Sequence, residues 1–418
     1  MTKRIELAHN PDFADLLDIK RDLYTLGGPI PFDEEAIAGC SNMILSGEIG
    51  FLSISSPMAR TEICTWRGEH TIIWDSRWLE FVNALCRLTM PFLVTGGAYW
   101  DSATAVQDVV TLFLIEQLSI LGETEVGLAL TLKRQLVARG RTAADILAPE
   151  PYLPDAQFRR RYKELARFAA DSLQHLTLIH EWLHLGFRLG VILHDTVIEQ
   201  LRPSLEDFVD TVRRAGEKFL ARLEGEERAR EALILDDMCA RLMRDGASEI
   251  SAEEIYCDVH AASRYARGYV APRVIRHNDA ALFRHGFWVI QNYLAAFYLF
   301  DQIAFFAATV VSRKGWNDVA FSGAARARDG MTKHVYRSAA ENVARQCSFS
   351  SASDIQADFT KIDGWFARYM IETLKWLRAF AFDPRWSDWR ASALAQVAGA
   401  GGIAAARADV WRYLGWPA

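Results

Sequence analysis

From Asp155 onward, apolar residues recur at helical spacing almost without a break, and this pattern constrains the fold more than any other feature. Leu176, Ile179 and Leu183, for example, are three or four residues apart, so they lie on one face of a helix. The stretch Trp316–Met331 is rich in Gly, Ala, Arg and Asp, and we expect it to be a loop. The sequence therefore predicts a long, mainly helical region.

The N-terminal quarter has a different pattern. Gly47–Ser56 is typical of a short strand, and Glu62–Trp66 and His70–Asp75 flank a glycine-containing turn, which indicates a hairpin. Ser76 follows as a helix start, and further helices are expected from about 103 to 148. The predicted fold class is therefore mainly α (α+β), with a small β-sheet near the N-terminus.

Breaks in the pattern suggest three segments. Pro151 and Pro154 interrupt the helical spacing and indicate a connector. We expect an α+β region over 1–150 that contributes its sheet to the active-site cleft, a helical core over 151–345, and a helical, tryptophan-rich extension over 346–418.

Composition excludes some classes of protein. The chain has 418 residues, of which 50% are hydrophobic and 24% charged, as expected for a globular protein with a sizeable core. Its formal net charge of −6 gives no basic field for phosphates, so we expect no nucleic-acid partner. The six cysteines lack CxxC spacing, and the N-terminus lacks the apolar segment of a secretory signal. These features favour a cytoplasmic protein.

One segment is nearly long enough to span a bilayer. Phe287–Val311 is rich in aromatic and aliphatic residues, but Gln291, Asn292, Asp301 and Gln302 interrupt it. Four polar groups at membrane depth would be costly, so we expect a buried core helix and no membrane partner. A membrane-embedded protein is the alternative.

The strongest chemical signal is at residues 180–184, which read His-Glu-Trp-Leu-His and match the pattern HExxH. On a helix, His180 and His184 are one turn apart, so both can bind one metal ion from the same face. Glu181 lies beside that face, where it can take a proton from a water on the metal. With only 10 histidines in the chain, this pattern is uncommon by chance.

Catalytic zinc usually takes three protein ligands, so a third is needed. Ser251 is a possible helix cap, and Glu254 and Asp258 would then share one face of the following helix. Glu254 could bind the metal while Asp258 accepts a hydrogen bond from a ligating histidine. Glu253 and Glu249 are alternative ligands, although only Glu254 pairs with Asp258 at one full turn. Alternatively, the two histidines and their acidic neighbours are ordinary polar side chains.

HExxH followed by ExxxD on a later helix resembles the gluzincin zinc metallopeptidases, in particular the CAAX-prenyl endopeptidase group and the Lit-like peptidases. The resemblance implies a zincin-like helical peptidase core. It also implies that His180, His184 and Glu254 hold Zn²⁺, that Glu181 is the general base, and that Asp258 orients His180.

Two further likenesses to these families are looser. The strand His70–Asp75 and the helix after it resemble the edge strand and helix that precede their metal helix. Their later histidine and arginine, which steady the tetrahedral intermediate, would correspond to His334 and Arg337, although the proline that normally follows the histidine is missing here. Tyr336 could equally donate to an oxyanion.

The sequence thus predicts a cytoplasmic, zinc-dependent hydrolase, an endopeptidase that acts on a peptide or protein substrate. One alternative is a non-catalytic zincin-like protein that binds or regulates. The presence of all four residues His180, Glu181, His184 and Glu254 argues against such a degenerate site. The other alternative is a membrane-embedded metalloprotease that uses Phe287–Val311 as a span.

Overall fold

The structure of the chain is a computed structural model. It describes residues 25–26, 49–55, 61–66, 68–94, 103–148, 156–279, 281–312, 323–346 and 352–416. The connector expected at Pro151 and Pro154, together with Cys40 and Cys347, lies outside the described residues. Within them the fold is mainly α-helical with one small sheet, which confirms the predicted fold class.

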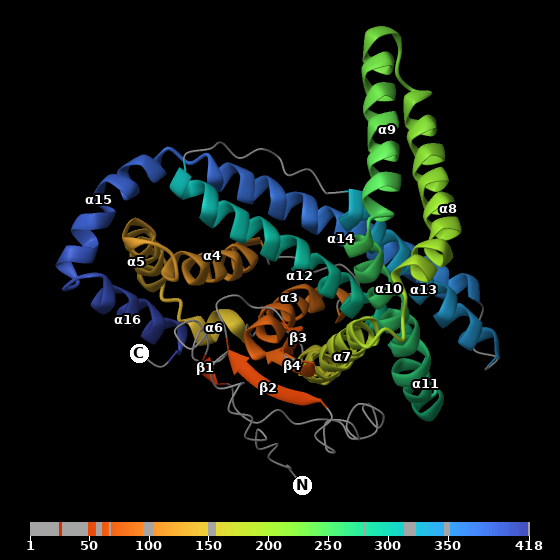
Figure 1. The fold of residues 1–418 in the computed structure, drawn as a ribbon, viewed down its shortest axis with the longest axis horizontal. Coiled ribbons are helices and arrows are strands. Elements are labelled where there is room, and N and C mark those ends of the chain that lie inside the picture. Colours follow the sequence, from red (N-terminus) through yellow and green to blue (C-terminus); the bar gives the residue numbers. More distant parts are fainter. Residues whose placement is uncertain are drawn as a thin grey trace. The chain divides into compact units, whose positions relative to one another are not determined.

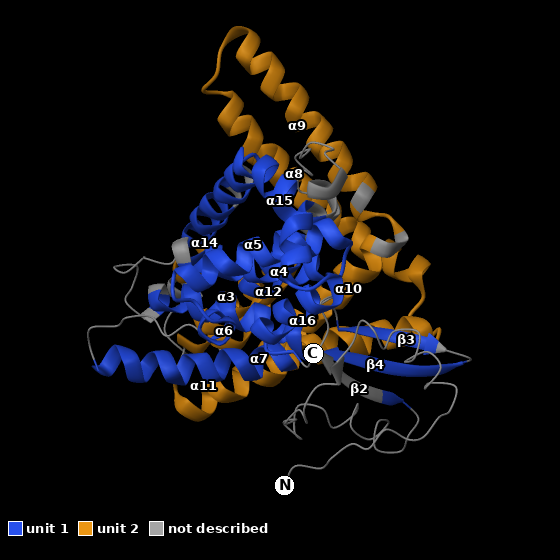
Figure 2. Cartoon of the chain, turned by 90° about the vertical axis from the view of Figure 1, so that its left-hand side faces the viewer, with its two compact units in different colours: residues 1–174, 292–317, 361–418 blue, residues 175–291, 318–360 orange. Residues whose placement is uncertain are grey.

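The chain forms two compact units, coloured separately in Figure 2. Unit 1 comprises 1–174, 292–317 and 361–418, and unit 2 comprises 175–291 and 318–360. Three long helices each contribute to both units: α7 (Ala156–Arg188), α12 (Ala281–Ser312) and α14 (Ala352–Ala381). The boundaries of these units therefore differ from those of the expected segments 1–150, 151–345 and 346–418. The three segments stay a prediction.

The sheet in unit 1 has four strands in the order β1-β2-β4-β3. The expected hairpin is present, because β3 (Glu62–Trp66) pairs antiparallel with β4 (Glu69–Asp75). Strand β2 (Gly50–Ser55) runs parallel to β4, and the two-residue β1 (Thr25–Leu26) pairs antiparallel with β2. Helix α3 (Ser76–Val94) follows β4 without a gap and contacts β2.

The remaining helices of unit 1 pack around α4 and α5. In the warm and dark-blue parts of Figure 1, α5 contacts α4, α15 and α16. Their bounds are α4 (Ala103–Ser119), α5 (Glu123–Ala138), α6 (Ala143–Leu147), α15 (Arg385–Gly399) and α16 (Ile403–Leu414).

Part of the described core of unit 1 is aromatic, and an ion pair is buried within the same unit. The ring of Trp78 lies 6.1 Å from Phe81 and 4.5 Å from Phe297. Next to Trp78 in the sequence, buried Arg77 donates from Nε to buried Glu116 at 2.6 Å. Removing one partner of such a pair leaves an uncompensated buried charge, so the pair fixes how α3 and α4 meet.

The described part of unit 2 is mainly helical. After the end of α7 come α8 (His194–Leu220) and α9 (Gly225–Gly246), which lie side by side in Figure 1. They are followed by α10 (Glu249–Arg264), a π-helical turn η1 (Tyr265–Val270), α11 (Ala271–His277) and α13 (Gly323–Gln346). Helix α10 contacts α8, α9, α13 and η1, so it is the central element of this unit.

Among the described residues, two apolar clusters join these helices. The larger joins α8, α9, α10 and α13 through buried residues including Leu205, Leu242, Ile255 and Met331. The smaller includes Leu183 and Phe187 of α7, Val197 of α8, and Ala252 and Cys257 of α10. Burial of such side chains contributes about 1.5–3 kcal/mol each, so the smaller cluster anchors the motif helix to α10.

Two details differ from the sequence predictions. The expected loop Trp316–Met331 is helical from Gly323 onward, because Met331 and Thr332 are buried and packing outweighs the weak helix propensity of this stretch. Helix α10 begins at Glu249 with Ser248 as the N-cap, so Ser251 lies inside the helix and does not begin it.

The apolar stretch Phe287–Val311 forms most of α12, and its aromatic residues Phe287 and Trp288 are buried in the protein. Among the described helices, none combines the length and the apolar character needed to cross a bilayer.

Candidate metal centre

The HExxH motif lies near the C-terminal end of α7, where the helix stops for a local reason. Gly190 has φ +68°, which only glycine adopts readily, and the amides of Val191 and Ile192 donate back to the carbonyl of Gly186 at 3.0 Å each. The helix ends at Arg188, so it presents His180 and His184 on its last full turns. Glu254 and Asp258 stand one turn apart on α10, as the sequence predicts.

The three predicted ligands come together. One ligand atom from each of His180, His184 and Glu254 lies within 4.8 Å of the others. Nε2 of His180 is 2.9 Å from Nε2 of His184, and the two nitrogens are 3.6 and 3.5 Å from oxygens of Glu254. Ligand atoms about 2.0–2.1 Å from a tetrahedral zinc lie roughly 3.3 Å apart, so this set fits zinc.

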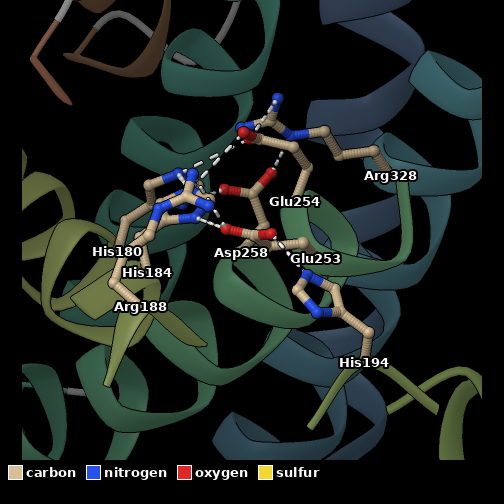
Figure 3. A network of polar contacts seen from close by, with 8 residues as sticks. All are labelled: His180, His184, Arg188, His194, Glu253, Glu254, Asp258 and Arg328. Atoms are coloured by element: carbon tan, nitrogen blue, oxygen red, sulfur yellow. Dashed lines mark hydrogen bonds and ion pairs between the residues drawn. The ribbon is translucent and has the colours of Figure 1, made fainter. Parts of the chain in front are cut away.

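The ring of His180 is held from behind by Asp258. Its Nδ1 lies 2.8 Å from Oδ1 of Asp258, which is fully buried. Arg328 of α13 contacts the other oxygen of Asp258 through Nε and reaches Oε2 of Glu254 at 3.1 Å through a terminal nitrogen (Figure 3). Burial raises the pKa of Asp258, but Arg328 and His180 outweigh burial and hold it well below its ordinary range.

The ring of His184 is held in the same way by Glu253. Its Nδ1 is 2.7 Å from Oε1 of Glu253, and the other oxygen of Glu253 is 2.7 Å from Nε2 of His194 at the start of α8. Arg188 approaches the same carboxylate at 3.8 Å. Burial raises the pKa of Glu253, but hydrogen bonds to the two histidines and the charge of Arg188 lower it to about 2.

These contacts determine which ring nitrogens carry hydrogen. An ionised carboxylate can only accept, so the Nδ1 atoms that face Asp258 and Glu253 are the protonated ones. With Nδ1 as the donor, Nε2 is the atom of each ring that can offer a lone pair to a metal, and the two Nε2 atoms of His180 and His184 face each other at 2.9 Å. Two lone pairs at this distance repel unless a proton or a metal cation lies between them.

The charge around the centre also suits a cation. Burial raises the pKa of Cys257 well above its ordinary value, and the charges of Glu254, Asp258, Glu181 and Glu253 raise it further. All four carboxylates therefore act on one point of α10. Glu181 is buried and belongs to this acidic group.

His334, Tyr336 and Arg337 lie farther along α13. His334 is exposed, and the guanidinium of Arg337 lies 4.9 Å from the centre of the Phe287 ring. The hydroxyl of buried Tyr336 donates to the carbonyl of Phe283 at 2.9 Å, which is a structural role. Arg337 is nine residues beyond Arg328, roughly 13 Å along the helix. A catalytic role of His334 or Arg337 stays a prediction from the resemblance alone.

Sequence reasoning missed three contributors to the centre. Arg328 lies in the stretch expected to be a loop, Glu253 is expected only as an alternative ligand, and His194 is not among the predicted site residues. The position of Glu253 next to Glu254 in the sequence could have indicated a contact with the motif helix. Neighbouring residues of a helix can both reach histidines that are one turn apart on another helix. No local pattern points to His194, since only tertiary packing brings it to Glu253.

No protein-family model, no curated protein and no solved structure matches this chain. The assignment of the centre therefore depends on its geometry and on the two motifs.

Proposed function

We propose that this chain is a zinc-dependent hydrolase that cleaves peptide bonds in protein substrates in the cytoplasm. The observation that carries the proposal is the convergence of His180, His184 and Glu254, with both rings oriented by buried carboxylates. Two imidazoles and one carboxylate are a common ligand set of catalytic zinc, and they leave a fourth position open.

Each residue then has a defined task. His180 and His184 would hold the ion through Nε2, and Glu254 would hold it through a carboxylate oxygen on a side chain that is 35% exposed, so the site is reachable from solvent. Bound zinc would polarise a carbonyl group and lower the pKa of a water to about 7. Glu181 would take a proton from the attacking water and pass it to the leaving amine.

Zinc content and turnover test the proposal together. Purified protein should hold one zinc per chain by atomic emission, and it should cut a mixed peptide library in a zinc-dependent way, detected by mass spectrometry. Glu181→Gln should keep the zinc and lose turnover, because the amide cannot accept the proton. Glu254→Gln should lower zinc occupancy, because it removes the charged ligand.

Glu206→Gln is the matched control, since it makes the same chemical change at an exposed position of α8 in the same unit. It should leave zinc content and turnover unchanged. Full turnover in Glu181→Gln, or unchanged zinc occupancy in Glu254→Gln, would contradict the assignment of these residues.

A further inference from the structure

Glu253 is shared between two histidines from different helices. Its carboxylate accepts hydrogen bonds from Nδ1 of His184 on α7 and from Nε2 of His194 on α8, each at 2.7 Å (Figure 3). The Glu253 side chain is only 10% exposed, and the His194 side chain is 33% exposed. His194 is therefore within reach of solvent, but its Nε2 points to a buried carboxylate.

The turn between α7 and α8 fixes the position of His194. The carbonyl of Gly186 accepts two backbone bonds from this turn, and the Ile192 side chain lies against Gly186. The imidazole of His194 also lies on the ring of buried Phe187, with 4.8 Å between ring centroids. A side chain that is held by backbone, ring contact and hydrogen bond has little freedom, so it can hold its partner in turn.

Glu253, which is adjacent to the proposed ligand Glu254, needs a second partner to hold its carboxylate in one orientation. A glutamate has three rotatable side-chain bonds, and a single bond to His184 does not fix both of its oxygens. On the other side of the centre, Asp258 is shorter and is held by Arg328. The counterpart of Arg328 for Glu253 is His194, since Arg188 is 3.8 Å away and half exposed.

We propose that His194 is a positioning residue for the metal centre: by holding Glu253, it fixes the orientation of the His184 imidazole toward the metal. This inference rests on the proposed function. It means that His194, at the start of α8 and outside both the HExxH and the ExxxD motif, contributes to zinc affinity.

The test measures zinc binding by competition with a chromogenic chelator, using zinc alone as the probe. Loss of the direct partner of a ligating histidine usually weakens metal binding by about 10- to 100-fold, and His194→Ala, which acts one step further out through Glu253, should weaken zinc binding by about 10-fold. His194→Gln, whose amide nitrogen can reach the position of Nε2, should restore much of the affinity. The visible spectrum of the cobalt-substituted protein should change in His194→Ala and return toward wild type in His194→Gln.

A double-mutant cycle shows whether His194 acts through Glu253. In a Glu253→Ala background, His194→Ala should change the zinc dissociation constant by less than about twofold, because the linking group is gone. Independent multiplication of the two effects would overturn the inference. His277→Ala, at an exposed histidine of α11, is the control and should leave affinity and spectrum unchanged.

These measurements distinguish a failure of the proposed function from a failure of the role proposed for His194. A wild-type chain that binds no zinc would overturn both the proposed function and this inference. Tight binding that depends on His180, His184 and Glu254 but is equal in wild type and His194→Ala would overturn the inference alone. If His194→Ala does not fold by circular dichroism, then His194→Gln and Glu253→Ala decide, because unchanged affinity in Glu253→Ala also overturns it.

Discussion

At the scale of single residues, the candidate centre is defined by the carboxylates behind the histidines as much as by the histidines themselves. Asp258 and Glu253 each face an Nδ1 atom, and each is anchored by a side chain from another helix, Arg328 or His194. This arrangement fixes both rings in the metal-free chain. An ordinary pair of surface histidines has no such constraint.

Arg328 allows a stability test that is independent of catalysis. Arg328→Met keeps the apolar stem but leaves fully buried Asp258 without its guanidinium partner. The free energy of unfolding should fall by about 3 kcal/mol, because a buried charge loses its partner. Urea unfolding of the zinc-free protein measures the change.

Arg213→Met provides the comparison for that loss. Arg213 pairs with Asp236 at 2.8 Å, but both side chains are exposed, so the loss of stability should be much smaller than in Arg328→Met. Equal losses in the two variants would show that the Asp258 contact is not specially important.

Glu253 gives a prediction on acid stability. Its pKa is lowered to about 2 from an ordinary value of 4.5, so the folded state binds this proton less tightly than the unfolded state does. The corresponding stability is present above pH 4.5 and is lost as the pH falls toward 2. In zinc-free protein, the stability difference between wild type and Glu253→Gln should therefore be larger at about pH 6 than at about pH 3. A difference that is constant over this range would contradict the prediction.

At the scale of elements, the sequence could predict which residues of α10 share a face. It could not predict which side chains from α8 and α13 contact that face. The one-turn spacing of Glu254 and Asp258 depends only on local helix geometry, so the sequence placed them correctly on one face. The start of α10 and the helical nature of Gly323–Met331 depend on packing against other helices. For that reason Arg328 and His194 could not be found from local patterns.

One glycine tests the packing of the other unit. A Cβ on Gly127 of α5 would lie 2.4 Å from the backbone carbonyl oxygen of Ala393 on α15, so the two helices must approach closely there. Gly127→Ala should force them apart and lower the free energy of unfolding by about 1–3 kcal/mol, measured by urea unfolding.

Gly364→Ala is the control for this substitution, because a Cβ on Gly364 of α14 meets nothing within 4 Å. An alanine there should be neutral or stabilising by up to about 1 kcal/mol, since it improves helix propensity. A similar loss in both variants would mean that close approach at Gly127 is not the cause.

At the scale of the whole molecule, all the residues that build the centre belong to unit 2, within 175–291 and 318–360. Zinc binding should therefore slow amide hydrogen exchange in the part of α7 after 175 and in α10, with little change in α4 and α5 of unit 1. Mass spectrometry of exchanged peptides resolves these segments. Protection confined to unit 1, or zinc-dependent protection that persists in Glu254→Gln, would place the ion elsewhere.

X-ray absorption of the zinc-loaded protein can show directly whether His180, His184 and Glu254 bind one zinc ion. If these three residues are the ligands, the spectrum should show four-coordinate zinc with nitrogen and oxygen at about 2.0–2.1 Å and the scattering signature of two imidazoles. A sulfur shell at about 2.3 Å, or a zinc ion without imidazole scattering, would contradict it.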